Sequence, residues 1–168
     1  HVYIHQPWSD RLPGVNAEYG TEINRNNTWF EFSKGWIDYL RRCHVLLQQG
    51  KPVADVLYFI GEETPQMTGP KVSSLPAGYD FDYINAEVLL NRLTVKEGKL
   101  FLPEGNSYRL LVLPEQRTMR PVVLKKIKEL VDSGATVIGY APERSPSNEN
   151  YSQADQEIRS ISKIVWGQ

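Results

Sequence analysis

Three predominantly apolar segments of strand length constrain the fold of this chain more than any other feature. They cover residues 53–60, 108–113 and 135–139. Apolar runs that lack strict alternation are typical of strands buried on both faces, as in a parallel sheet covered by helices. Parallel strands need long connections, and the intervening stretches are long enough to contain helices. The three segments therefore predict an α/β domain.

Helical patterns separate and follow these segments, as such a sheet requires. Asp80 or Asp82 is expected to cap a helix that extends to about Leu93. Pro121 is expected to open a second helix, because its fixed φ suits the first turn. A third helix is expected over residues 152–165. This alternation of strands and helices is typical of a doubly wound, flavodoxin-like fold with three layers.

The loops after the three segments bear on function, because α/β domains bind ligands at the carboxyl ends of their strands. They are residues 61–65, 114–118 and 140–144. None is glycine-rich, so none offers the bare backbone amides of a phosphate-binding loop. Class I glutamine amidotransferases, which share this layout, carry a Cys or Ser nucleophile directly after a central strand. Residues 113–119 contain neither, which makes residues 51–168 an amidotransferase-like α/β domain without a nucleophile.

The first fifty residues follow a different pattern. Alternating apolar side chains predict a strand at residues 1–8 that ends at Pro7. After a long loop, Thr28 and Glu31 have the spacing of a capping box before a predicted helix at residues 29–49. Apolar residues recur in this helix at spacings of three and four, namely Phe32, Trp36, Ile37, Leu40, Cys43 and Leu47.

Charge and composition exclude several partners. The chain has 19 Lys and Arg against 20 Asp and Glu, a formal net charge of -1, and the two signs are interspersed. This balance argues against nucleic acid and against an anionic membrane surface. No apolar run approaches the length of a membrane span. The single Cys43 cannot form an internal disulfide, and His1, His5 and His44 share no ligand spacing, so no metal or cofactor is expected in this chain.

Two adjacent acids, Glu62 and Glu63, follow the first apolar segment and are weak catalytic candidates. Paired carboxylates can supply the acid and the base of glycoside hydrolysis. The alternative is a solvated pair of loop acids, and it stays open at this point. The chain is also rich in aromatic residues, with 4 Trp, 9 Tyr and 5 Phe, many of them in the first forty residues. Aromatic planes beside Asn, Gln and Arg suit sugar rings, but they also suit a tight core or an interface.

Several strings of residues add to this picture. The first fifty residues contain His5-Gln-Pro-Trp8 and Arg25-Asn-Asn-Thr-Trp29, and later residues include Gly78-Tyr-Asp-Phe-Asp82 and Tyr108-Arg-Leu-Leu-Val-Leu-Pro114. Together these strings resemble family 106 of the glycoside hydrolases, the bacterial α-L-rhamnosidases. The resemblance extends over nearly the whole chain, and the first two strings are its most specific part.

The resemblance implies that residues 1–50 are the last strand and helix of a (β/α)8 catalytic barrel, and that residues 51–168 are the amidotransferase-like domain that follows it. Active sites of such barrels lie at the carboxyl ends of their strands. The resemblance therefore places five side chains at the rim of the sugar site, which are His5, Gln6, Trp8, Asn26 and Trp29.

The resemblance also implies an activity, the hydrolysis of terminal rhamnose from plant or bacterial polysaccharide. Two carboxylates carry out this reaction in the family, and both are expected outside this chain, with a calcium ion near the sugar in the parent enzyme. The parent is then expected to be a periplasmic or secreted bacterial protein that binds a rhamnose-containing glycan. The isolated chain is expected to be inactive.

Two other hypotheses remain. One is a non-catalytic, flavodoxin-like binding or interaction module, in which the first segment is only an arm, and the other is a small intact hydrolase that uses Glu62 or Glu63. Behaviour in solution separates the barrel remnant from the native module. A remnant would leave Trp8, Trp29 and Trp36 on an exposed apolar patch and would self-associate, whereas a native module would be monomeric.

Overall fold

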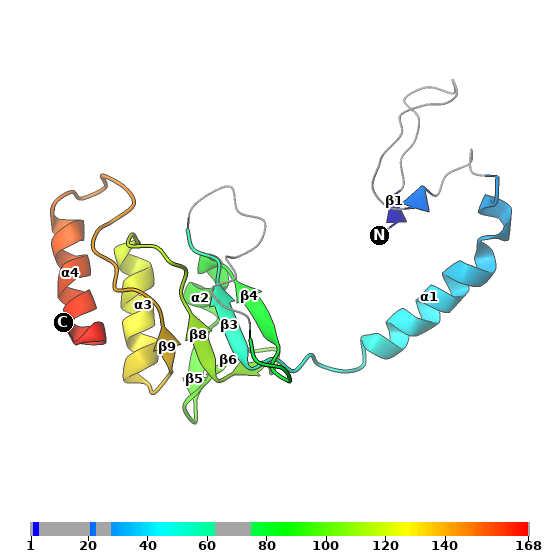
Figure 1. The fold of residues 1–168 in the computed structure, drawn as a ribbon, viewed down its shortest axis with the longest axis horizontal. Helices are drawn as coiled ribbons and strands as arrows, with labels where there is room; N and C mark the ends of the chain where they lie inside the picture. The colour runs from blue at the N-terminus through cyan, green and yellow to red at the C-terminus, as the bar shows by residue number, and fades with distance from the viewer. Residues whose placement is uncertain (1, 4–20, 23–27, 63–74, 168) are drawn as a thin grey trace, which may run out of the picture. The chain divides into compact units, whose positions relative to one another are not determined.

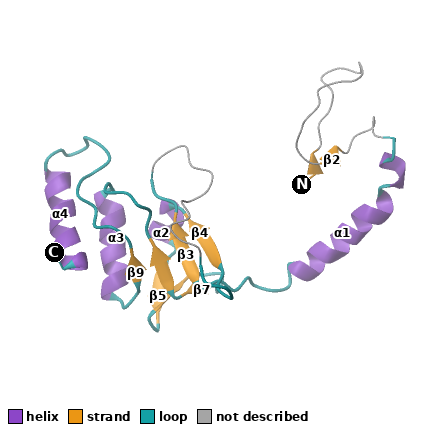
Figure 2. Ribbon diagram, in the orientation of Figure 1, coloured by secondary structure: helices purple, strands orange, loops and turns teal. Residues whose placement is uncertain are grey.

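The computed structural model describes residues 2–3, 21–22, 28–62 and 75–167. The chain divides into two compact units, residues 1–50 and residues 51–168 (Figure 1). Helices and strands occur in both units, but the sheet-forming residues are concentrated in the second (Figure 2).

The described part of the first unit consists of short strands and one long helix. Strand β1 (Val2–Tyr3) pairs in parallel with β2 (Thr21–Glu22). A 3-10 turn, η1 (Phe30–Phe32), precedes helix α1 (Lys34–Leu47). The body of the predicted helix is therefore confirmed, and the rest of the predicted strand at residues 1–8 lies outside the described residues.

The predicted start of this helix is wrong. Ser33, rather than Thr28, is the N-cap residue of α1. The Ser33 hydroxyl donates to the carbonyl oxygen of Phe30 at 2.5 Å, and this bond closes the 3-10 turn from which the α-helix continues. The spacing of Thr28 and Glu31 suggested a capping box, but η1 takes up the intervening residues.

The apolar face of α1 is open. No residue of α1 is buried, and Phe32 and Leu47 are 82% and 78% exposed. Trp29 and Trp36 are each 40% exposed and meet edge to face, with ring centroids 6.4 Å apart. The apolar stripe predicted from the sequence is therefore present but is not enclosed.

The second unit contains a parallel sheet of four strands. These are β3 (Val56–Phe59), β4 (Phe81–Ile84), β8 (Leu110–Val112) and β9 (Val137–Ile138), arranged in the order β4-β3-β8-β9. All three apolar segments thus supply strands, as predicted. The third is not buried, however, because β9 has only β8 as a neighbour in the described sheet and Ile138 is 55% exposed.

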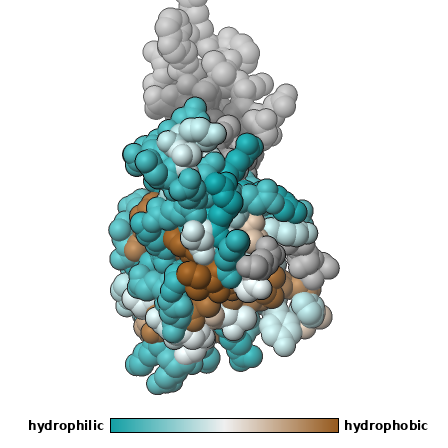
Figure 3. Space-filling model, turned by 90° about the vertical axis from the view of Figure 1, so that its left-hand side faces the viewer, coloured by the Kyte–Doolittle hydropathy of each residue, from teal (hydrophilic) through white to brown (hydrophobic). Residues whose placement is uncertain are grey.

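Three helices accompany this sheet, namely α2 (Ala86–Asn91), α3 (Pro121–Asp132) and α4 (Gln153–Trp166). Helix α3 begins at Pro121 as predicted, and α4 also agrees with the prediction. Helix α4 lies beside α3 (Figure 1). Seen from the side of α4, the surface is mainly hydrophilic and surrounds a patch of apolar side chains (Figure 3).

The helix predicted to start at Asp80 or Asp82 begins later. Residues 81–84 instead form β4, because Phe81 pairs with Val56 of β3 and the aromatic rings of this strand pack on Tyr58. Asn85 is the true N-cap of α2, and its side chain accepts a hydrogen bond from the Val88 N–H at 3.0 Å.

A small antiparallel sheet lies between α2 and β8 in the sequence. It consists of β5 (Thr94–Lys96), β6 (Lys99–Phe101) and β7 (Ser107–Tyr108). The predicted strand at residues 108–113 is thus divided between two sheets. The Tyr108 hydroxyl connects them, because it donates to Asp82 Oδ2 of β4 at 2.9 Å.

The main core lies on one face of the parallel sheet. Leu57 and Phe59 of β3 pack there with Leu111 of β8 and with side chains from all three helices, such as Leu89, Ile127 and Ile158. The other face carries a smaller cluster of Val56, Tyr58 and Val112. The second unit is therefore a mixed α/β structure, a parallel sheet with a small antiparallel sheet attached.

Candidate functional site

The order of the parallel strands identifies where a ligand site is expected. In open α/β sheets, ligands bind outside the carboxyl ends of the strands, at the point where the strand order reverses. The chain passes from β3 to β4 on one side and from β8 to β9 on the other, so this point lies between β3 and β8. The residues that follow these strands include Glu62, Gln116 and Arg120.

Glu62 is held by the start of helix α3. Its side chain is only 11% exposed, and its Oε2 accepts a hydrogen bond from the Arg120 backbone N–H at 3.0 Å. Its Oε1 pairs with the Arg120 guanidinium. Arg120 is the N-cap residue of α3, so the carboxylate lies where the helix dipole favours negative charge. The described contacts of Glu62 therefore join the end of β3 to α3.

Gln116 lies against Gly61, the residue before Glu62. Gly61 has a φ of +84°, and a Cβ atom built on it would lie 2.8 Å from Gln116 Oε1. The side chain of Gln116 thus occupies the position that any larger residue at 61 would need. Neither Cys nor Ser occurs in the turn after β8, residues 113–119. The turn after β8 therefore offers no Cys or Ser nucleophile, and Gln116 lies against Gly61 at this edge of the sheet.

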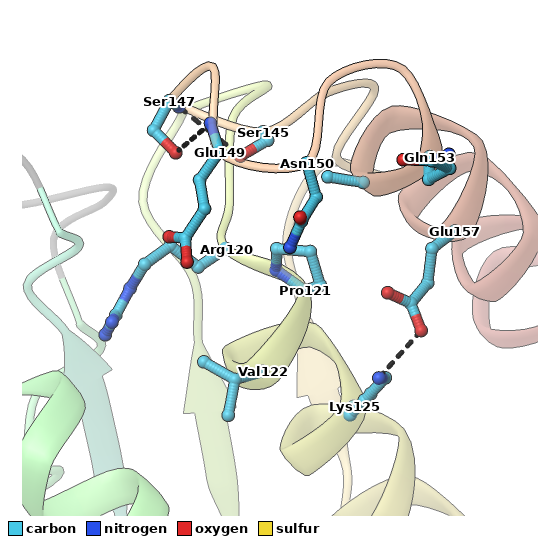
Figure 4. A pocket seen from close by; sticks show the side chains of 11 residues that line it. Arg120, Pro121, Val122, Lys125, Ser145, Ser147, Glu149, Asn150, Gln153 and Glu157 are labelled. Atoms are coloured by element: carbon cyan, nitrogen blue, oxygen red, sulfur yellow. Dashed lines mark hydrogen bonds and ion pairs between the residues drawn. The ribbon is translucent and has the colours of Figure 1, made fainter.

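A hollow of about 570 Å³ lies next to Arg120, between the first turns of α3 and α4 and the loop that joins β9 to α4 (Figure 4). Pro121 and Val122 form an apolar part of its wall, and Asn150 extends from the loop toward Pro121. Lys125 pairs with Glu157 across it at 2.7 Å. Because both of its cations are already paired with acids and Glu149 adds a negative charge, the hollow does not suit an anionic ligand.

Hydrogen bonds fix the loop above this hollow. The Ser145 N–H donates to Asp155 Oδ1 at 2.8 Å. The Ser147 N–H donates to Ser145 Oγ, and the Glu149 N–H donates to Ser147 Oγ, both at 3.3 Å. None of the predicted site residues lies in this loop, and its succession of Ser and Asn residues is the signal in the sequence that could have identified it.

Of the residues predicted for the sugar site, Trp29 lies within the described part of the chain. His5, Gln6, Trp8 and Asn26 lie outside the described residues. Trp29 is described, and it lies at the start of the first unit's helical segment against Trp36. Glu63 also lies outside the described residues, so the predicted pairing of two carboxylates stays a prediction.

Neither a metal site nor a membrane span is found among the residues that the structure describes. Among them, no group of three or more His, Cys, Asp or Glu side chains could hold a metal ion. Within the same residues, no helix combines the length and the apolar character needed to cross a bilayer.

Comparison with known proteins identifies close relatives. A family model described as alpha-L-rhamnosidase, glycoside hydrolase family 106, matches residues 1–168. A curated protein of Formosa agariphila named "Putative beta-glucuronidase" is 46% identical over 170 residues, which cover 99% of this chain and 14% of that protein. The solved rhamnosidase of Novosphingobium sp. PP1Y is 37% identical, with a TM-score of 0.73 over 88% of this chain and 14% of the longer one. The chain therefore spans only a small part of the length of these relatives.

Proposed function

The chain belongs to the α-L-rhamnosidases of glycoside hydrolase family 106, and on this premise we propose that it is part of an enzyme that removes terminal rhamnose from plant or bacterial polysaccharide. The observation that carries the proposal is the family match along the entire chain. The similarity to a rhamnosidase in both sequence and fold supports it.

In this proposal, residues 1–50 are the end of the catalytic (β/α)8 barrel. Helix α1 supports the assignment, because its apolar stripe is of the kind that packs against the strands and helices of a larger body. The sugar contacts are assigned to the side chains predicted for the rim, which are His5, Gln6, Trp8, Asn26 and Trp29.

The second unit, residues 51–168, is proposed to be a flavodoxin-like, amidotransferase-like domain that supports the barrel. Its strand order supports this assignment, because β4 lies on one side of β3, whereas β8 and β9 lie on the other side. The absence of Cys and Ser from residues 113–119 fits a domain of this kind without a nucleophile. We assign both catalytic carboxylates to other parts of the parent protein, and we assign no calcium ligand to the described residues.

Mutation of the rim residues in the parent protein tests the proposal. His5→Ala, Gln6→Ala and Trp8→Ala are each expected to lower kcat/KM for an aryl α-L-rhamnoside by at least about tenfold, because each removes a contact to the reacting sugar. Lys34→Ala, at an exposed position of α1, is the control and should leave the activity unchanged.

Two results would contradict the proposal. Unchanged activity in all three variants would remove the assignment of residues 1–8 to the sugar site. Cleavage of the aryl rhamnoside by the isolated 168-residue chain would show that the catalytic groups lie within it.

A further inference from the structure

A second hollow, of about 470 Å³, lies between the loop after β9 and the side of helix α4. Its wall includes Arg117, Tyr140 and Glu143 from the loops, and Arg159 and Lys163 from α4. No predicted site residue lies in it, and it is formed entirely by the second unit.

The frame of this hollow is fixed by hydrogen bonds. The Ser162 hydroxyl of α4 donates to the Pro142 carbonyl oxygen at 2.7 Å, and the Trp166 indole N–H donates to the Gly139 carbonyl oxygen at 2.8 Å. The Glu143 N–H donates to the Arg117 carbonyl oxygen at 2.8 Å. Because these bonds hold the loops against α4, the hollow is formed before any ligand arrives, which lowers the entropic cost of binding.

One wall of the hollow is aromatic. The Tyr140 ring is 53% exposed, and the Arg117 guanidinium lies 5.8 Å from its centroid. The same guanidinium pairs with Glu143. Tyr140 is therefore held in position by a cation–π contact while part of its ring stays open to solvent. An exposed aromatic ring of this kind can pack against the C–H groups of a sugar ring and offer its hydroxyl as a hydrogen-bonding partner.

The other wall carries unbalanced positive charge. Arg159 and Lys163 are four residues apart on α4, so they are neighbours on its surface, with about 6 Å between their Cβ atoms. Among the residues that the structure describes, neither has an ion-pair partner, and the acid of the hollow, Glu143, is paired with Arg117. Like charges at this spacing repel each other, and an anion placed between them would relieve that repulsion.

The hollow of Figure 4 provides the contrast. There Lys125 is paired with Glu157, and Arg120 is paired with Glu62. Both cations of that hollow are paired with acids and Glu149 adds a further negative charge to its lining, whereas the hollow beside Tyr140 has two cations with no acid partner among the described residues. An acidic ligand should therefore prefer the second hollow.

We propose that the hollow formed by Tyr140, Arg159 and Lys163 is a non-catalytic binding site for an acidic sugar residue of the glycan. The carboxylate or sulfate group of the sugar binds between Arg159 and Lys163, and the sugar ring packs against Tyr140. The guanidinium of Arg159 suits the binding of such a group, because its fork of N–H donors matches the oxygens of both a carboxylate and a sulfate. The inference rests on the proposed function for the assumption that the natural ligand is a glycan.

Titration of the full 168-residue chain tests the site. The probes are a glucuronate-containing oligosaccharide, its carboxyl-reduced counterpart and a sulfated oligosaccharide with the same neutral backbone. Isothermal titration calorimetry should show binding of at least one acidic probe, weakened by added salt, and at least about tenfold weaker binding of the reduced probe. The two acidic probes distinguish a carboxylate ligand from a sulfate ester.

Matched variants separate a built site from general charge attraction. The double variant Arg159→Gln, Lys163→Gln should weaken binding of the acidic probe at least about tenfold, and Tyr140→Ala should weaken it severalfold. The control is the double variant Lys96→Gln, Lys99→Gln. It removes the same charge from a pair of exposed lysines that face each other across β5 and β6, where no aromatic residue is paired with them, and it should leave binding unchanged.

Three outcomes would overturn the inference. The first is that no acidic probe binds, and the second is that the control variant loses as much binding as the double variant at Arg159 and Lys163. The third is that inorganic sulfate or a single-stranded oligonucleotide binds as tightly as the acidic sugar and that Tyr140→Ala does not weaken this binding. Failure of the proposed function would be seen in a different measurement, since the parent protein would show no activity on an aryl rhamnoside. The double variant at Arg159 and Lys163 should leave that activity unchanged.

Discussion

The two units of this chain bury apolar side chains to very different extents. In the second unit, Leu57, Leu111 and Ile127 are almost completely buried in one continuous cluster. In the first unit, α1 also has an apolar stripe, but none of the residues of this helix is buried. Burial of one large apolar side chain stabilises a fold by about 1.5–3 kcal/mol. The second unit therefore has a stable core of its own, whereas α1 has the surface of an element that packs against something else.

The two units also differ in the sequence separation of the residues that form their ion pairs. Within the described part of the first unit, the ion pairs of Asp38 with Lys34 and Arg41 connect residues three or four positions apart on one helix. In the second unit, Glu62 and Arg120 meet across 58 residues of sequence. Local pairs stabilise a helix whether or not the rest of the chain folds, but the long-range pair forms only when β3 and α3 are assembled.

The largest expected effect comes from removing a core side chain. Leu111→Ala should lower the free energy of unfolding by about 2–5 kcal/mol, because it leaves a cavity in the main cluster. The matched variant Leu47→Ala removes the same group from an exposed position of α1 and should change it by less than about 0.5 kcal/mol. Urea denaturation followed by tryptophan fluorescence measures both. A comparable loss in the two variants would show that α1 is packed as firmly as β8.

The sequence predicted the second unit better than the first, and the reasons are physical. Apolar runs revealed β3 and β8 because strands buried on both faces leave a pattern that is independent of their partners. Strand β4 was missed because Asp80 and Asp82 resemble helix caps, although the alternation of Phe81 and Tyr83 is the pattern of a strand.

The sites were harder to predict than the strands. Glu62 could be identified as an acid at the end of a strand, but its partner Arg120 could not, since their contact depends on how β3 and α3 pack. The spacing of Arg159 and Lys163 is visible in the sequence, yet only the fold brings Tyr140 beside them. A pattern along one element can be read directly, whereas a site formed by several elements requires the tertiary structure.

The second prediction concerns the open face of α1. We expect the isolated chain to self-associate through this face, since exposed apolar patches of this kind associate in water. Leu47→Glu places a charge on the face and should weaken self-association at least about tenfold, because it removes about 1.5–3 kcal/mol of apolar burial from each contact. Sedimentation velocity over a range of concentrations measures the effect.

Ile164→Glu is the control for this prediction, because Ile164 is an exposed apolar residue of α4 in the second unit. Equal weakening by both variants would mean that the two units do not differ in this respect. A chain that stays monomeric at every concentration would favour the native binding module over the barrel remnant.

The third prediction concerns the link between β3 and α3. Glu62→Ala should lower the free energy of unfolding by about 1–2 kcal/mol, since it removes both the charge and the acceptor at the start of α3. Glu104→Ala removes an acid from a more exposed pair with Arg92 and should cost less than about 0.5 kcal/mol. Thermal unfolding of both variants checks the difference. Equal effects would mean that Glu62 is merely a surface acid, which would free it for another role.

The smallest expected effect tests the hydrogen bond that joins the two sheets of the second unit. Burial, together with the hydrogen bond to the Asp82 carboxylate, raises the pKa of Tyr108 from 10.0 to about 12. A raised pKa means that the fold favours the protonated phenol, so its contribution to stability is complete below pH 10 and is lost as the pH rises toward about 12. Tyr108→Phe should cost about 0.5–1.5 kcal/mol at neutral pH, because it removes this bond.

The variant and the unchanged chain should therefore differ less as the pH rises through that window, because only the unchanged chain has a phenol at position 108 to ionise. Urea denaturation at a series of pH values measures the convergence. Tyr39→Phe, at an exposed position of α1, is the control and should have no effect at neutral pH. If the difference in unfolding free energy between Tyr108→Phe and the unchanged chain were constant with pH, the fold would not favour the protonated phenol. The contrast between an enclosed second unit and an open first unit would then not extend to polar contacts.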